Sequence, residues 1–100
     1  MRFKFDHRKS KKLKADPKRK IGFTEVQEIW NHPHYVDFRS DDPEQFRAIG
    51  WVKGQLFSAI YEIREDEEGE YYHLVTLWKS TRQEENLYEE HSQKNQSVSR

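Results

Sequence analysis

The sequence of 100 residues contains no cysteine, only three prolines and four glycines, and no long apolar run. Without cysteine, the chain has neither a disulfide framework nor a thiolate metal site. A membrane-spanning helix needs about 20 apolar residues, and a signal peptide needs an apolar segment near its start; neither pattern is present. We therefore expect a cytoplasmic protein that does not associate with a membrane.

Charged residues make up 36% of the chain and hydrophobic residues 33%, so only a modest core can form. This length suits one small domain, which we expect to span residues 1–90. Residues 91–100 contain no large apolar side chain except Val98. We expect them to form a disordered C-terminal tail.

The formal net charge is zero, but the two signs are separated along the sequence. Lysine and arginine dominate the first 20 residues, which include Asp6 and Asp16 as the only acids, whereas acids crowd residues 65–70 and 84–90. A basic segment this dense is typical of polyphosphate binding. Two alternatives remain open: the segment is a solvated helix face with a mobile arm, or it lies against the acidic loop or an acidic partner.

The N-terminal half predicts a strand over Arg2–Phe5, a helix over Asp6–Lys14, a helix over Thr24–Trp30 and a short strand over His34–Arg39. Asp6 can cap the first helix, and Pro17 ends it because proline disfavours helix in the residue before it. Thr24 and Gln27 can form a capping box for the second helix. Residues 40–43 have the composition of a turn.

The C-terminal half predicts strands over Gln45–Val52, Gln55–Arg64 and about Tyr71–Trp78, followed by a helix to Glu90. Gly54 accepts the positive φ that a tight hairpin turn demands, and an acidic loop over residues 65–70 joins the next two strands. Ser80 with Gln83, or Thr81 with Glu84, offers a capping box. The order predicts an α+β fold, an antiparallel meander with two N-terminal helices and one C-terminal helix.

Strict alternation along the last predicted strand separates two sets of side chains. One set contains His73, Val75 and Leu77, and the other contains Tyr72, Thr76 and Trp78. The face that carries Ser58, Arg64, Thr76 and Trp78 is the candidate functional surface, although a single bulge would exchange the faces locally. On the apolar side, His73 is interpreted as a structural histidine, with proton transfer as its alternative role.

Several short patterns resemble the BrnT family of type II toxins, small ribonucleases of the RelE-like fold. They are Ala48-Ile49-Gly50, Gly54, Tyr61 with Arg64, residues 75–80, and Glu84 with Tyr88, with looser matches at Phe5-Asp6 with Lys9 and at residues 21–25. Three positions depart from the family pattern. Gln45 and Trp78 replace family arginines, and Leu13 replaces an asparagine.

Metal-independent RNA cleavage needs deprotonation of a 2′-hydroxyl, cations around the phosphorane and a proton for the leaving oxygen. The candidate catalytic residues are Arg64, Lys79, Arg82 and Arg47. The candidate RNA-binding residues are Lys9, Lys11, Lys12 and Lys14 in the basic helix, with Tyr72 and Trp78 as base-stacking platforms. His32 and His34 beside Asp37 lack a third well-placed ligand, and no cofactor motif is present, so we expect neither a metal nor a cofactor.

The resemblance implies an endoribonuclease that cleaves RNA and thereby arrests translation. It also implies that a BrnA-type DNA-binding antitoxin neutralises the enzyme, and that the complex of the two proteins binds operator DNA. The alternative is a catalytically impaired homologue that acts as a nucleic-acid-binding or antitoxin-binding module, and the departures at Gln45 and Trp78 support it. A third hypothesis is nucleic-acid binding through the basic N-terminal segment alone.

Overall fold

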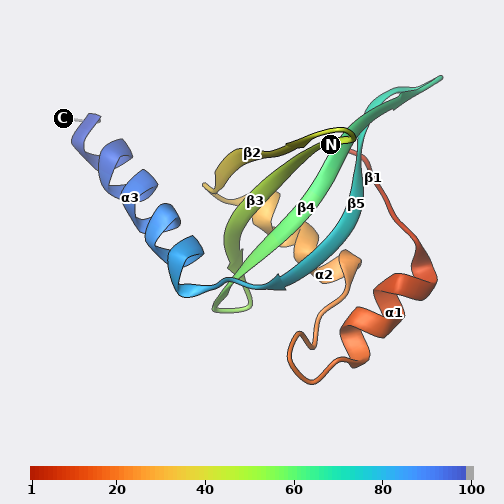
Figure 1. Ribbon diagram of the computed structural model, residues 1–100, viewed down its shortest axis with the longest axis horizontal. Helices are drawn as coiled ribbons and strands as arrows, with labels where there is room; N and C mark the ends of the chain where they lie inside the picture. The colour runs from red at the N-terminus through yellow and green to blue at the C-terminus, as the bar shows by residue number, and fades with distance from the viewer. Residues whose placement is uncertain (99–100) are drawn as a thin grey trace.

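The computed structural model describes residues 1–98, with side chains through residue 92. Its elements are β1 (Phe3–Lys4), α1 (His7–Ala15), α2 (Phe23–Val26), the 3-10 helix η1 (Gln27–Asn31), β2 (Tyr35–Asp41), β3 (Glu44–Val52), β4 (Gln55–Asp66), β5 (Gly69–Lys79) and α3 (Arg82–Val98). The protein is therefore an α+β fold, as the sequence predicted (Figure 1).

One five-stranded sheet forms the centre of the molecule, with strand order β1-β5-β4-β3-β2. Strands β2 to β5 form the expected antiparallel meander. The N-terminal strand adds itself in parallel to β5, with Phe3 opposite Tyr72 and Lys4 opposite His73. The sheet is consequently mixed, whereas the sequence predicted an antiparallel one, because no local pattern specifies a parallel partner so far away in the chain.

Two short turns join the strands β3, β4 and β5, and the second is shorter than the loop that the sequence predicted. At the β3–β4 turn, Lys53 has φ 50° and Gly54 has φ 80°, which confirms the predicted hairpin. The strands β4 and β5 pair out to Asp66 and Gly69, where the glycine has φ 110°. Residues 65–70 are thus the acidic tip of a long hairpin, which corrects the predicted loop.

The helices α1 and α2 and the 3-10 helix η1 cover one face of the sheet, which we call the inner face. The inner-face side chains of the sheet include Ala48, Val52, Phe57, Ala59, Tyr61, Leu74 and Leu77. Phe23, Val26 and Ile29 pack against them from the helices with no exposed surface. Burial of these side chains supplies most of the hydrophobic stabilisation available to a chain this small.

The helices α1 and α2 approach each other closely at Gly22. A Cβ atom at this position would lie 2.6 Å from the Ser10 hydroxyl, so a larger residue would force the helices apart. The Ser10 hydroxyl accepts a hydrogen bond from the Phe23 N–H, and the Glu25 carboxylate accepts one from the Gly22 N–H. Gly22 and Glu25 therefore occupy the cap positions expected for Thr24 and Gln27, and the helical segment starts earlier and continues as 3-10 helix to Asn31.

A register shift in β5 changes which side chains face the helices. Ile60 pairs with Thr76 but the next residue, Tyr61, pairs with Leu74, so Val75 is a bulge. Beyond the bulge, Tyr72 and Leu74 lie on the inner face with Leu77. Tyr71 and His73 consequently join Thr76 and Trp78 on the opposite face, which we call the outer face, and this corrects the predicted placement of Tyr72 and His73.

The helix α3 leaves the end of β5 and extends away from the sheet (Figure 1). The Thr81 hydroxyl accepts from the Glu84 N–H, and the Glu84 carboxylate accepts from the Thr81 N–H, which confirms the capping box expected there. The structure assigns helix as far as Val98, and residues 99 and 100 lie outside the described part. Disorder of the tail over residues 91–100 stays a prediction. No helix in the described residues has the length and apolar character needed to cross a membrane.

Candidate functional site on the outer face

Four polar residues meet on the outer face beside the β4–β5 hairpin. Cross-strand pairing places Glu62 opposite His73 and Arg64 opposite Tyr71. Residues directly opposite in an antiparallel ladder have Cβ atoms about 4.5 to 5.5 Å apart. The sheet therefore brings a carboxylate, a guanidinium, a phenol and an imidazole together, and we call these four residues the hairpin cluster.

Within the hairpin cluster, Glu62 orients Arg64. The Arg64 Nε and one terminal nitrogen donate to the Glu62 Oε1 at 3.0 and 2.6 Å, and Gln45 donates to Oε2 at 2.8 Å. The hydrogen bond from Gln45 is the largest influence that holds the pKa of Glu62 below its ordinary value. The Arg64 side chain keeps 47% of its surface exposed, so its remaining nitrogen can reach a ligand from solvent.

Next to this pair, His73 is half-buried and surrounded mainly by cations. Burial lowers the pKa of His73, the positive charges of Arg64 and Lys9 lower it further, and only the charge of Glu62 opposes them. Because its pKa lies below the ordinary histidine value, His73 is largely neutral at pH 7 and can accept a proton. Lys9, whose charge acts on His73, belongs to α1, which follows β1 directly along the chain.

A second polar cluster on the outer face joins α3 to the sheet. Arg47 in β3 forms a bidentate ion pair with Asp37 in β2 and donates to the Glu84 Oε2 at 3.2 Å. The Trp78 Nε1 donates to the other Glu84 oxygen at 2.9 Å. Arg47, Asp37, Glu84 and Trp78 form a connected network, which we call the helix anchor.

The helix anchor holds a charge in an almost buried position, because Glu84 is only 4% exposed. Burial acts to raise the pKa of Glu84, but the bonds from Thr81 and Trp78 and the charge of Arg47 together hold it below its ordinary value. Among the described residues, no buried side-chain nitrogen or oxygen lacks a hydrogen-bond partner. Arg47 therefore pairs with two carboxylates, and its bond to Glu84 links α3 to the sheet.

The four cations expected to be catalytic do not share one centre. Arg64 lies opposite Tyr71 and Lys79 lies opposite Phe57, which separates them by seven positions of β4, roughly 23 Å. Lys79 follows Trp78 and therefore points to the other side of the sheet, and Arg82 is exposed in the first turn of α3. Of the expected group, Arg64 lies beside Glu62, Tyr71 and His73, whereas Arg47 is paired with Asp37, which also accepts from the Tyr35 hydroxyl.

The two aromatic residues expected to stack on RNA bases have different environments. The Tyr72 ring packs on the inner face against Tyr61 at 4.6 Å and Trp30 at 5.8 Å between ring centroids, so it belongs to the core. Trp78 is partly exposed, and the Arg39 guanidinium lies 5.2 Å from its ring centroid. Trp78 therefore lies outside the core, and Arg39 covers one face of its ring.

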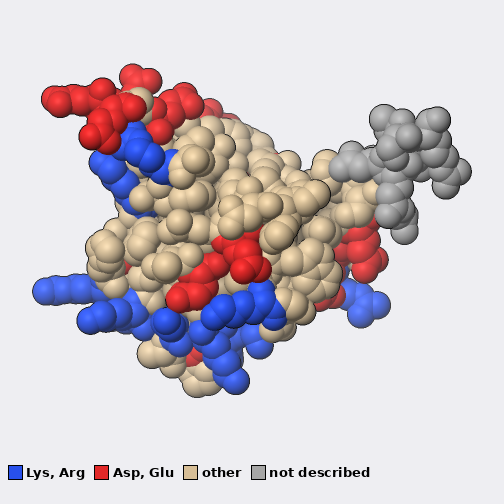
Figure 2. Space-filling model, turned by 180° about the vertical axis from the view of Figure 1, so that it is seen from behind, with Lys and Arg blue, Asp and Glu red and all other residues tan. Residues whose placement is uncertain are grey.

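The helix α1 carries most of the basic surface seen in Figure 2, where lysine and arginine gather on the same side of the molecule as this helix. Lys9, Lys11 and Lys12 are exposed, and none of them forms an ion pair with the described side chains. Lys14 pairs with Glu25 at 3.0 Å. The expected RNA-binding lysines are thus accessible, with Lys14 partly neutralised.

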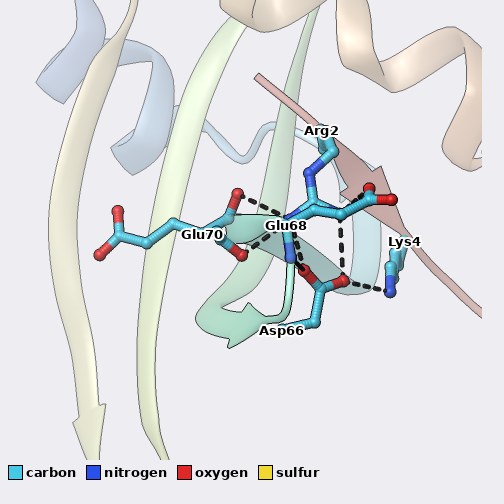
Figure 3. Close-up of polar contacts among 6 residues, drawn as sticks. Arg2, Lys4, Asp66, Glu68 and Glu70 are labelled. Atoms are coloured by element: carbon cyan, nitrogen blue, oxygen red, sulfur yellow. Dashed lines mark hydrogen bonds and ion pairs between the residues drawn. The ribbon is translucent and has the colours of Figure 1, made fainter.

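The start of the chain binds the acidic hairpin tip (Figure 3). Arg2 donates to Asp66 at 2.7 Å and to the Gly69 carbonyl at 2.7 Å, and Lys4 donates to Asp66 at 2.7 Å. Both cations also lie over the Tyr71 ring. The hypothesis that the basic segment contacts the acidic loop is confirmed for Arg2 and Lys4, and the cations of α1 form a separate surface.

No protein-family model matches this sequence, and no curated protein matches it. The functional argument therefore rests on the chemistry of the two clusters and the basic surface.

Proposed function

We propose that this protein is a metal-independent endoribonuclease of the RelE-like fold, similar to BrnT toxins and controlled by a BrnA-type DNA-binding antitoxin. The observation that carries the proposal is the position of His73. It has a lowered pKa beside Arg64 on the outer face of the sheet, and the charge of Lys9 in the basic helix α1 contributes to that shift. This arrangement combines a proton acceptor, a phosphate-binding cation and an electrostatic path for the RNA backbone.

In the proposed reaction, neutral His73 removes the proton from a 2′-hydroxyl, and the resulting oxygen attacks the adjacent phosphorus atom. Arg64, oriented by Glu62, donates hydrogen bonds to the phosphorane oxygens as negative charge develops on them. Tyr71 lies opposite Arg64 on the same face and can supply a proton to the leaving 5′-oxygen. Lys9 and the other exposed lysines of α1 attract the backbone of the substrate.

A second candidate function is a non-catalytic module that binds nucleic acid or an antitoxin. It is favoured by the full commitment of Arg47 and by the separation of Lys79 from Arg64, because a cleavage site normally assembles several cations around one phosphate. Gln45, bound to Glu62, adds no charge at a position where the resembling family has arginine.

The two functions are separated by expressing the chain alone under tight control and by assaying the purified protein on single-stranded RNA. For a ribonuclease, growth stops and RNA is degraded, and Arg64→Ala slows cleavage about 100-fold or more. His73→Gln should do the same, whereas His32→Gln, at an exposed turn residue, should cleave as the parent does.

The pH profile identifies the proton acceptor. Because His73 must be neutral to accept a proton and its pKa lies below 6.5, parent cleavage should rise with pH through that acidic range and then level off. A folded Arg64→Ala variant that cleaves at the parent rate would refute the site. Absence of cleavage above buffer in the parent would establish the non-catalytic function instead.

A further inference from the structure

A cavity of about 270 Å³ lies at the edge of β5, away from the hairpin cluster, and it is lined by Lys18, Arg19, Trp78 and Lys79. Its lining contains three cations and an indole but no carboxylate. The volume is slightly below the usual range for ligand pockets, so the cavity suits a single nucleobase or phosphate group.

The α1–α2 connection builds one wall of this cavity. Asp16 accepts backbone hydrogen bonds from Arg19 at 3.0 Å and Lys20 at 2.8 Å, and its carboxylate accepts from the Lys18 N–H at 2.8 Å. Arg19 then forms an ion pair with Asp16 and donates from Nε to the Leu77 carbonyl at 2.7 Å. The turn is thereby attached to the β5 edge, which β1 covers only at Tyr72 and His73.

The two lysines of the cavity keep their charge available. Lys18 and Lys79 are exposed and form no ion pair with the described side chains, whereas Arg19 is committed to Asp16 and the β5 backbone. Trp78 is held by its bond to Glu84 and lies under the Arg39 guanidinium, so its ring is ordered before any ligand binds and a base would stack on the face away from Arg39. An ordered indole beside two unpaired ammonium groups can bind a base by stacking and a phosphate by charge.

We propose that this cavity binds one nucleotide of a single-stranded RNA, with the base against Trp78 and the phosphate between Lys18 and Lys79. The choice of RNA rests on the proposed function, but the pocket does not require cleavage. The same chemistry would accept a free nucleotide, so the test compares both sources of the ligand.

Binding of adenosine monophosphate, a short single-stranded oligoadenylate and inorganic phosphate is measured by calorimetry at several salt concentrations. We expect the oligoadenylate to bind most tightly and adenosine monophosphate to bind more tightly than phosphate. Trp78→Ala should weaken adenosine monophosphate binding about 10-fold or more, the effect of losing one stacked base, and leave phosphate binding unchanged. Lys18→Gln with Lys79→Gln should weaken all three ligands and reduce the salt dependence.

The matched controls are Trp51→Phe and Lys53→Gln, which alter an exposed indole and an exposed lysine outside the cavity and should bind as the parent does. Because Trp78 also bonds to Glu84, the surface double variant Lys18→Gln/Lys79→Gln provides a test that leaves the helix anchor intact. A folded double variant with parental affinity for adenosine monophosphate would overturn the proposal. So would inorganic phosphate that binds as tightly as adenosine monophosphate.

The test of nucleotide binding at the cavity can be separated from the test of RNA cleavage at the hairpin cluster. His73→Gln should bind adenosine monophosphate with parental affinity, because His73 lies outside the cavity. A parent protein that binds the nucleotide at this cavity but does not cleave RNA would support the pocket and refute the ribonuclease. A parent that cleaves RNA while the cavity variants bind normally would refute the pocket alone.

Discussion

At the residue scale, Glu84 is the position on which the attachment of α3 depends. Its carboxylate accepts hydrogen bonds from the Thr81 N–H, the Trp78 indole and Arg47, although only 4% of the residue is exposed. Removing the carboxylate would leave a partly buried guanidinium with Asp37 alone and an indole N–H without its acceptor. Loss of these partners costs more than loss of an exposed contact, because the groups left behind are poorly solvated.

Glu84→Ala should therefore lower the free energy of unfolding by about 3 kcal/mol, of which the lost cap accounts for about 1 kcal/mol. Urea unfolding followed by circular dichroism measures the change. The matched control is Glu89→Ala, an exposed glutamate in the same helix, which should change stability by less than about 0.5 kcal/mol. Equal effects of the two substitutions would show that Arg47 and Trp78 do not depend on Glu84.

The sequence reveals only part of such a site. The spacing of Thr81 and Glu84 identifies a capping box without any tertiary information, and that prediction is confirmed. The contact between Glu84 and Arg47 joins residues from distant elements, and nothing in the local pattern specifies it. For the same reason, the sequence predicted Arg47 as a catalytic cation but did not indicate its ion pairs with Asp37 and Glu84.

At the element scale, the faces of β5 show how one bulge limits prediction from alternation. The strands, the Lys53-Gly54 turn and the meander order follow from residue type and spacing, and all are present. The bulge at Val75 reverses the facing of every residue between it and the hairpin tip, which moves His73 to the outer face and Tyr72 into the core. No glycine or proline marks the bulge, so residue type does not reveal its position.

The docking of β1 is an element-scale contact that depends on pH. Hydrogen bonds from Arg2 and Lys4 hold the pKa of Asp66 well below its ordinary value of 3.8. A carboxylate with a lowered folded-state pKa stabilises the fold above its unfolded pKa, and this stabilisation is lost as the pH falls through the folded value. The contribution of Asp66 should therefore be complete near neutral pH and decrease below about pH 4.

To test this prediction, the free energies of unfolding of the parent and of Asp66→Asn are compared across pH. We expect Asp66→Asn to be the less stable protein near pH 7 and the difference between them to shrink progressively below about pH 4. Glu67→Gln removes a neighbouring acid of the same hairpin tip that forms no ion pair with the described side chains, and it should show no such convergence. A difference that is constant down to the lowest accessible pH would mean that Arg2 and Lys4 do not act through the Asp66 charge.

At the scale of the whole molecule, charge is divided between the basic surface of α1 and the acidic hairpin tip (Figure 2). The zero net charge therefore does not describe the field that an RNA strand meets. The charge of Lys9 acts on His73, while the α1–α2 connection places Lys18 at the β5 edge. The proposed cleavage site and the proposed nucleotide pocket are both supplied with cations by the first 20 residues, although the strands of the meander provide their other groups.

This division of charge predicts how RNA affinity depends on salt. Lys11 and Lys12 are exposed on α1, outside both the hairpin cluster and the β5-edge cavity, so their replacement tests the basic surface alone. Each phosphate contact on single-stranded nucleic acid contributes about 0.7 to the slope of log affinity against log salt. Lys11→Gln/Lys12→Gln should therefore weaken RNA binding at low salt and reduce that slope by up to about 1.4.

The measurement is fluorescence anisotropy of a labelled single-stranded RNA at a series of salt concentrations, with Lys53→Gln as the matched loss of an exposed lysine elsewhere. Counterion release is a property of the contact itself, so the two α1 lysines should act additively and without regard to RNA sequence. Lys14→Gln should have a smaller effect, because the Lys14 ammonium already pairs with Glu25 at 3.0 Å. An unchanged slope in the double variant would reduce α1 to a solvated helix face and leave the hairpin cluster and the β5-edge cavity as the only candidate contacts with RNA.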